Sequence, residues 1–211
     1  MLRIIDDFLN KTTMYRLVLR SLMLLWAWGF LMSFFGVMPF KPFDALASLL
    51  VIGNGCVLIN WIFEKLFKVA SNIESTYITL LILALIVGPE STVKGFWFLI
   101  VISFLAIASK YLVTINQKHV FNPAAFAIAF SSLALNYYAS WWIGNIYMVP
   151  LVIILGMLIT RKLRRSDLVI SFFVAYLIIS FGITSSFEKI VFSFKELLMF
   201  SPIPFFAFVM L

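Results

Sequence analysis

The residue types best suited to binding a ligand gather in one short stretch, residues 118–126. It holds the only histidine, His119, next to Lys118 and followed by the pair Asn122-Pro123. Asparagine is a good N-cap and proline is tolerated at the first helical position, so this pair predicts a helix start, with residues 124–135 as the helix. The N-terminus of such a helix favours an anionic or hydrogen-bonding ligand. The simpler alternative is an ordinary span that begins after a polar loop, with Lys118 and His119 facing lipid headgroups.

A second group of candidates lies about one predicted span earlier. The apolar run 76–87 contains Thr79 and is ended by Gly88-Pro89, a strong helix breaker. Thr79 offers a hydroxyl to a ligand, although its ordinary role is a hydrogen bond to its own helix. Gly88 and Pro89 either let the chain approach a ligand closely or form only a turn.

The composition places these candidates in a membrane protein. Of the 211 residues, 64% are hydrophobic and 12% are charged, and the mean hydropathy is +1.09. Soluble domains have roughly 45–50% apolar and about 25% charged residues. One histidine and one cysteine, Cys56, cannot build a zinc, haem or iron–sulfur site within this chain, so no metal site is expected. The sequence therefore predicts an all-α polytopic membrane protein that contacts the lipid bilayer, and no nucleic-acid partner.

Apolar runs separated by polar or breaking residues divide the chain. A basic lead is predicted at 1–20, one membrane domain at 21–184, and a loop with the start of a further helix at 185–211. The predicted crossings are 21–38, 45–63, 76–87, 94–108, 124–135, 141–160 and 168–184, with an eighth that begins at 201. The last run stops at Leu211, where a free carboxylate in hydrocarbon is costly, so we expect a chain truncated within a span.

The distribution of basic residues favours a cytoplasmic N-terminus in a cell membrane. With eight crossings, 12 of the 16 Lys and Arg residues fall in the inside loops and 4 fall outside. Cytoplasmic loops carry such an excess. Counting 76–87 and 124–135 as crossings is what produces this division, although each is shorter than the ~20 residues that cross a bilayer. Two short segments next to breakers also indicate broken helices around a central site, as in transporters built from inverted repeats.

Two motifs in their order resemble one known family. The run TLLILALIVGP at 79–89 is followed, after one span, by FNPAA at 121–125, and a WW…G…RK segment follows at 141–162. This order resembles the NqrB/RnfD family, the flavin-carrying membrane subunits of sodium-pumping NADH:quinone oxidoreductase and of the Rnf electron transport complex. The resemblance implies a urea-transporter-like inverted repeat of two five-helix halves, with the second half incomplete here.

The resemblance also implies a function and a departure from it. It implies an oxidoreductase subunit that passes electrons through a flavin from a cytoplasmic reductant to a membrane acceptor, with coupling to ion movement and other redox subunits as partners. Family members attach FMN covalently to the threonine of an S-G-A-T motif. The corresponding loop at 131–140, SSLALNYYAS, has no threonine. The expected cofactor is therefore FMN or riboflavin bound non-covalently, with Thr79, Gly88, Pro89, Lys118, His119, Asn122 and Pro123 as the candidate binding residues.

Two functions from other classes stay open. The Asn-Pro-Ala sequence at 122–124 resembles the half-helix motif of aquaporins, which indicates a small-solute channel or transporter. Only one such motif is present in the chain. The missing flavin threonine instead favours a non-catalytic membrane scaffold subunit.

Overall fold

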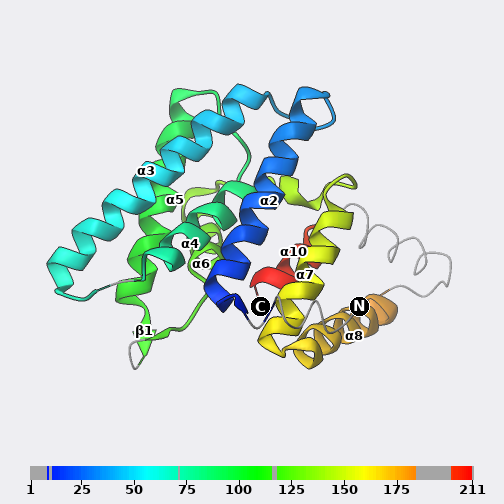
Figure 1. Ribbon diagram of the computed structural model, residues 1–211. Helices are drawn as coiled ribbons and strands as arrows, with labels where there is room; N and C mark the ends of the chain where they lie inside the picture. The colour runs from blue at the N-terminus through cyan, green and yellow to red at the C-terminus, as the bar shows by residue number, and fades with distance from the viewer. Residues whose placement is uncertain (1–8, 10, 71, 116–117, 184–200, 211) are drawn as a thin grey trace. The chain divides into compact units, whose positions relative to one another are not determined.

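The computed structural model describes residues 9, 11–70, 72–115, 118–183 and 201–210 (Figure 1). The chain divides into two compact units. One comprises Leu19–Trp142, and the other comprises Met1–Val18 with Ile143–Leu211. The boundary falls inside the first long helix, and each unit is described by itself.

The chain is a predominantly helical membrane protein. Three described helices are long and apolar enough to cross a bilayer: α2 (Met14–Phe34), α3 (Pro42–Phe67) and α5 (Val93–Leu112). Two shorter apolar helices, α4 (Ile73–Ile86) and α6 (Pro123–Leu135), complete the helices of the Leu19–Trp142 unit, and we call them the half-helices. The prediction of short helices at 76–87 and 124–135 is confirmed to within three residues.

Local sequence explains where these helices begin and end. Asn72 caps α4 by accepting a hydrogen bond from the Glu74 amide, and Thr92 caps α5 through the Gly95 amide. Lys68 closes α3 in the left-handed conformation. The first span starts seven residues earlier than predicted, at Met14, so the basic lead is partly helical. Arginine favours helix, which is why polarity alone placed this boundary wrongly.

The half-helix α4 is the best-buried helix of its unit. Every residue from Thr79 to Val87 is buried, because α4 packs against α3, α5 and α6. Helix α5 lies between α3 and α6 and packs on both. Small residues allow α3 and α5 to approach closely. A Cβ added to Gly55 of α3 would lie 3.2 Å from the Cβ of Ser103 in α5. Close approach through small residues is typical of helix pairs in membranes.

The other unit contains α7 (Val149–Leu163), α8 (Ser166–Ile183), the short helix α10 (Ile203–Phe205) and the π-helical turn η2 (Phe206–Met210). The turn η2 packs on α7, where Phe208 fills the space beside Gly156. The run that begins at Ser201 is therefore helical within its described residues.

The bounds of one predicted span are wrong. The run 141–160 is not one helix, because a 3-10 turn at Trp142–Gly144 and a polar turn precede α7. The Asn145 side chain accepts a hydrogen bond from the Tyr147 amide and stabilises that turn, and Pro150 then lies in the first turn of α7. Asparagine stabilises turns in this way through its side chain. The end of the predicted span 168–184 lies outside the described residues.

Candidate functional site

The start of α6 has the geometry that its sequence predicts. The Asn122 side-chain oxygen accepts hydrogen bonds from the amides of Ala124 and Ala125 at 3.1 and 3.3 Å. Pro123 occupies the first helical turn and is buried. The prediction of an Asn-Pro helix start is confirmed. Because Asn122 already occupies these amides, the helix offers a ligand its dipole rather than free N–H groups.

A short hairpin returns the chain from the end of α5 to the start of α6. Strand β1 (Thr114–Ile115) pairs with β2 (Lys118–His119) in antiparallel register. The Val120 amide then donates to the Val113 carbonyl at 3.2 Å. Asn122 follows two residues later, so α6 begins beside the last turn of α5. The backbone of Lys118 and His119 lies in this hairpin, and their side chains fall outside the described residues.

Lys110, in the last turn of α5, joins α5 to the start of α4. Its Nζ donates to the Ser75 carbonyl at 2.8 Å and to the Ser75 hydroxyl at 3.2 Å. Among the residues that the structure describes, these two oxygens are the partners of the ammonium group. An ammonium group has three donors, so one remains for another acceptor. Both half-helices therefore start near the same end of α5, where Lys110 lies.

The first turns of α4 also contain two buried threonines. Thr79 donates its hydroxyl to the Ser75 carbonyl at 3.0 Å, which is the ordinary back-bond expected of it. Thr76 is only 1% exposed, and its hydroxyl has no hydrogen-bond partner among the described residues. A buried hydroxyl without a partner costs free energy unless a ligand or water satisfies it.

The electrostatics of this end favour negative charge. The N-termini of α4 and α6 contribute partial positive charges and Lys110 adds a full one, while the C-terminus of α5 contributes a partial negative charge. A cation near a helix N-terminus is unfavourable by itself. Glu74, in the first turn of α4, compensates part of this charge. The arrangement can hold an anionic group such as a phosphate.

The far ends of the half-helices are closed by the segment after α6. The Trp141 amide donates to the Ile86 carbonyl at 2.8 Å, and the Trp142 indole N–H donates to the Ala84 carbonyl at 2.9 Å. These bonds satisfy carbonyls that the end of α4 leaves without partners. They also show that α4 and α6 run in the same direction, because both helices end near residues 140–142.

Gly88 and Pro89 lie at this far end, away from the Lys110 end. A Cβ on Gly88 would lie 2.9 Å from the Ser140 hydroxyl, so the close neighbour of Gly88 is a side chain of this protein. The predicted binding residues therefore fall into two groups. Thr79, Asn122 and Pro123 belong to the first turns of the half-helices, and the backbone of Lys118 and His119 lies in the hairpin just before α6. Gly88-Pro89 belongs to the C-terminal side.

The carboxyl group of Glu90 follows the Gly88-Pro89 turn. The Glu90 amide donates to the Ser48 hydroxyl at 2.8 Å, and the Glu90 side chain covers Gly95 in the first turn of α5. Burial raises the pKa of the Glu90 carboxyl above its usual value. The contact with Gly95 requires a glycine, since an added Cβ would lie 2.7 Å from the Glu90 Cβ.

Three residues of this site, Ser75, Thr76 and Lys110, were not predicted. Lys110 lies after the end of the predicted crossing 94–108, but α5 extends to Leu112 and includes it. A lysine at the end of an apolar run was the available signal, because ionisable groups in spans mark functional positions. The contact with Ser75 joins residues 35 positions apart, and no local pattern encodes it.

Comparison of this chain with protein-family models, with curated proteins and with solved structures finds no match.

Proposed function

We propose that this chain is the membrane subunit of an electron transport complex of the NqrB/RnfD type, and that it binds FMN or riboflavin non-covalently. In this role it passes electrons from a cytoplasmic reductant to an acceptor in the membrane, next to other redox subunits and with coupling to ion movement. The observation that supports the proposal best is the approach of both half-helix N-termini to Lys110. Helix ends inside a membrane protein, aimed at a bound anion, are typical of ligand sites in such folds.

The residues at this end fit the phosphate of FMN. Lys110 has one donor left, and the Thr76 hydroxyl lacks a partner among the described residues. A bound flavin supplies the electron-carrying chemistry, and the protein contributes placement and electrostatics. Lys110 would hold the phosphate as a point charge, while the capped helices add their dipoles. No covalent link is part of the proposal, because residues 131–140 include no threonine.

We also propose a more detailed fold than the three long membrane-spanning helices described above. It has eight crossings with a cytoplasmic N-terminus and a urea-transporter-like inverted repeat whose second half is incomplete. The parallel direction of α4 and α6 supports it, since both would run from the inside to the outside in that topology. Lys65, Lys68 and Lys110 would then lie at the cytoplasmic face, as the positive-inside rule requires.

Flavin binding by the purified protein tests the proposal. The chain is purified in detergent, incubated with FMN and desalted, and flavin released by acid is measured by its absorbance. Lys110→Met should weaken FMN binding by about 10- to 100-fold, since hydrogen bonds to charged groups contribute ~1.5–3 kcal/mol. Lys94→Met, at an exposed position in the first turn of α5, is the matched control and should bind normally.

Two results would count against the proposal. Absence of bound flavin in the unsubstituted protein contradicts it, and so does equal binding by Lys110→Met. Solute flux through proteoliposomes without flavin would support the channel alternative, for which α6 with its Asn-Pro-Ala start is the relevant feature. If the protein shows neither bound flavin nor solute flux, the scaffold alternative remains.

A further inference from the structure

Two basic segments that lie far apart in the sequence meet in the unit that contains α7. Lys162, in the last turn of α7, donates a hydrogen bond from its Nζ to the Leu9 carbonyl, 153 positions earlier in the chain. Leu9 and Leu17 also pack against Ile159 of α7. The basic lead of the chain therefore lies at the C-terminal end of α7, where the sequence RKLRR at 161–165 joins α7 to α8.

The cations of these two segments form what we call the basic surface. Within the described residues, its members are Lys11, Arg16, Arg161, Lys162, Arg164 and Arg165. All of them are exposed except Lys162, which is half-buried. Asp167 is the one acidic residue in the described part of this unit, and Asp6 and Asp7 of the lead lie outside the described residues. Positive charge therefore predominates on this surface.

Arg164 keeps a cation at a position where glycine is the usual residue. Its φ is 54°, in the left-handed region. Its amide donates to the Arg161 carbonyl, and the Arg165 amide donates to the Thr160 carbonyl, which closes α7 in a Schellman motif. Within the described part of the chain, the Arg164 guanidinium has no partner. A side chain held in a left-handed conformation is costly, and such strain is a reason to look for a role of that side chain.

The depth of the basic surface follows from the apolar residues on either side of it. Met157, one turn before Arg161, and Leu168, within one turn after Arg165, are exposed apolar side chains of the kind that face lipid. The connection between α7 and α8 is only the two residues Arg164 and Arg165. A turn this short does not extend far beyond the hydrocarbon, so its guanidinium groups lie in the headgroup layer.

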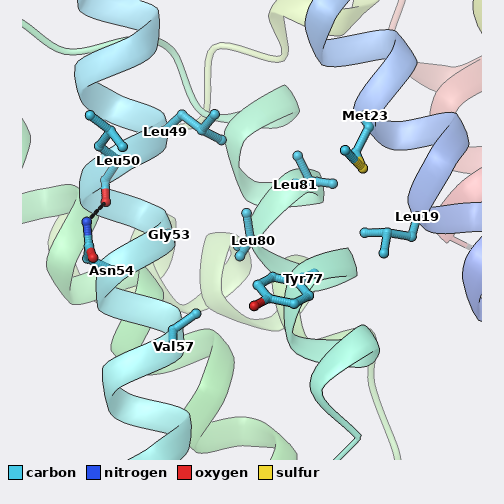
Figure 2. A pocket seen from close by; sticks show the side chains of 10 residues that line it. All are labelled: Leu19, Met23, Leu49, Leu50, Gly53, Asn54, Val57, Tyr77, Leu80 and Leu81. Atoms are coloured by element: carbon cyan, nitrogen blue, oxygen red, sulfur yellow. Dashed lines mark hydrogen bonds between the residues drawn. The ribbon is translucent and has the colours of Figure 1, made fainter.

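Other open surfaces of the chain fit an anion less well. The groove between α2, α3 and α4 has hydrocarbon side chains on most of its wall and no charged residue (Figure 2). A groove at the end of α3 combines Lys65 and Lys68 with Glu64. The Leu19–Trp142 unit as a whole has seven Lys and Arg residues against four Asp and Glu, so it is not the charge complement of the basic surface. Lipid phosphates are the abundant negative groups at the depth of the turn.

We propose that the basic surface binds the headgroups of anionic phospholipids. Guanidinium groups pair with phosphate oxygens through two parallel hydrogen bonds. Clusters of four to eight Lys and Arg residues directly beside a membrane helix attract anionic lipids. An acidic soluble protein fits less well, because the two-residue connection keeps its cations within the headgroup layer. This binding is independent of the proposed flavin site, since the two share no residue.

Lipid binding by the purified chain tests the proposal. The protein is titrated in a neutral detergent with phosphatidylglycerol or with phosphatidylcholine of the same acyl chains, and bound lipid is measured by native mass spectrometry. Phosphatidylglycerol should bind about tenfold more tightly or better. Arg164→Gly should lower its affinity by about fivefold, the effect of one basic residue near a membrane surface, and leave phosphatidylcholine unchanged. Because glycine fits the left-handed conformation, the melting temperature should stay equal or rise.

Lys68→Gly is the matched control, because Lys68 is also exposed and left-handed but lies beside Glu64. It should lower the affinity for phosphatidylglycerol much less, and Arg164→Lys should retain most of the binding. Equal affinity of the unsubstituted chain for the two lipids overturns the proposal, and so does an equal loss in the two glycine variants. Binding of polyglutamate that Arg164→Gly abolishes, without a preference for phosphatidylglycerol, would overturn it in favour of an acidic protein partner.

Discussion

The Thr76 hydroxyl is buried and has no hydrogen-bond partner among the described residues. Thr76→Val keeps the shape of the side chain and removes the unsatisfied group. We therefore expect thermal unfolding in detergent to show stability that is unchanged or higher, by up to about 1–3 kcal/mol. In the same variant, FMN binding should weaken if this hydroxyl contacts the phosphate. A clear loss of stability without flavin would show that the hydroxyl has a structural partner. Thr79→Val, which removes the bond to Ser75, is the control for local effects.

Glu90 gives the protein a pH dependence whose sign follows from its surroundings. Burial raises the pKa of this carboxyl in the folded state above the unfolded value. The folded state is therefore favoured at acid pH, where Glu90 is protonated, and this contribution is lost as the pH rises through the folded pKa. Glu90→Gln should raise the melting temperature at neutral pH, and the difference should shrink as the pH falls below the unfolded pKa. Melting curves of both proteins from acid to neutral pH check this. A difference that grows toward acid pH would contradict it.

At the scale of elements, α4 depends on residues that follow α6. The Trp142 indole N–H donates to the buried Ala84 carbonyl, and its ring packs edge-on against Phe40. Trp142→Phe keeps an aromatic ring but leaves that carbonyl without its donor. The cost should be about 1–3 kcal/mol in unfolding free energy. Trp97→Phe, at a position that is 65% exposed, should have almost no effect. Equal melting temperatures for the two variants would mean that Trp142 does not hold the end of α4.

The sequence predicted the elements better than it predicted their contacts. The start of α6 follows from local chemistry, since Asn122 and Pro123 act within one helical turn. The short α4 follows from its apolar run and its Gly-Pro breaker. The error at 141–160 has a physical cause, because a turn held by Asn145 interrupts a run that hydropathy alone joins. The contact between Lys110 and Ser75 depends on how α4 and α5 pack, which no periodicity reveals.

At the scale of the whole molecule, the common direction of α4 and α6 bears on the membrane topology of the chain. Both begin at the end of α5 where Lys110 lies, and both end near residues 140–142. If each crosses the membrane, the hairpin at the start of α6 and the loop after it lie on opposite sides. If α6 re-enters instead, both lie on one side. The distribution of Lys and Arg favours crossing, with the hairpin inside.

Thiol labelling of exposed loop residues distinguishes these arrangements. In the Cys56→Ser background, Thr114→Cys marks the hairpin and Tyr138→Cys marks the loop after α6, and both positions are exposed. A membrane-impermeant maleimide should label Tyr138→Cys in intact cells, because that loop is expected outside. It should label Thr114→Cys only after the membrane is permeabilised. Labelling of both in intact cells would make α6 re-entrant and contradict eight crossings. The reverse pattern would place the N-terminus outside, and the proposed cytoplasmic reductant would then face the wrong end of the half-helices.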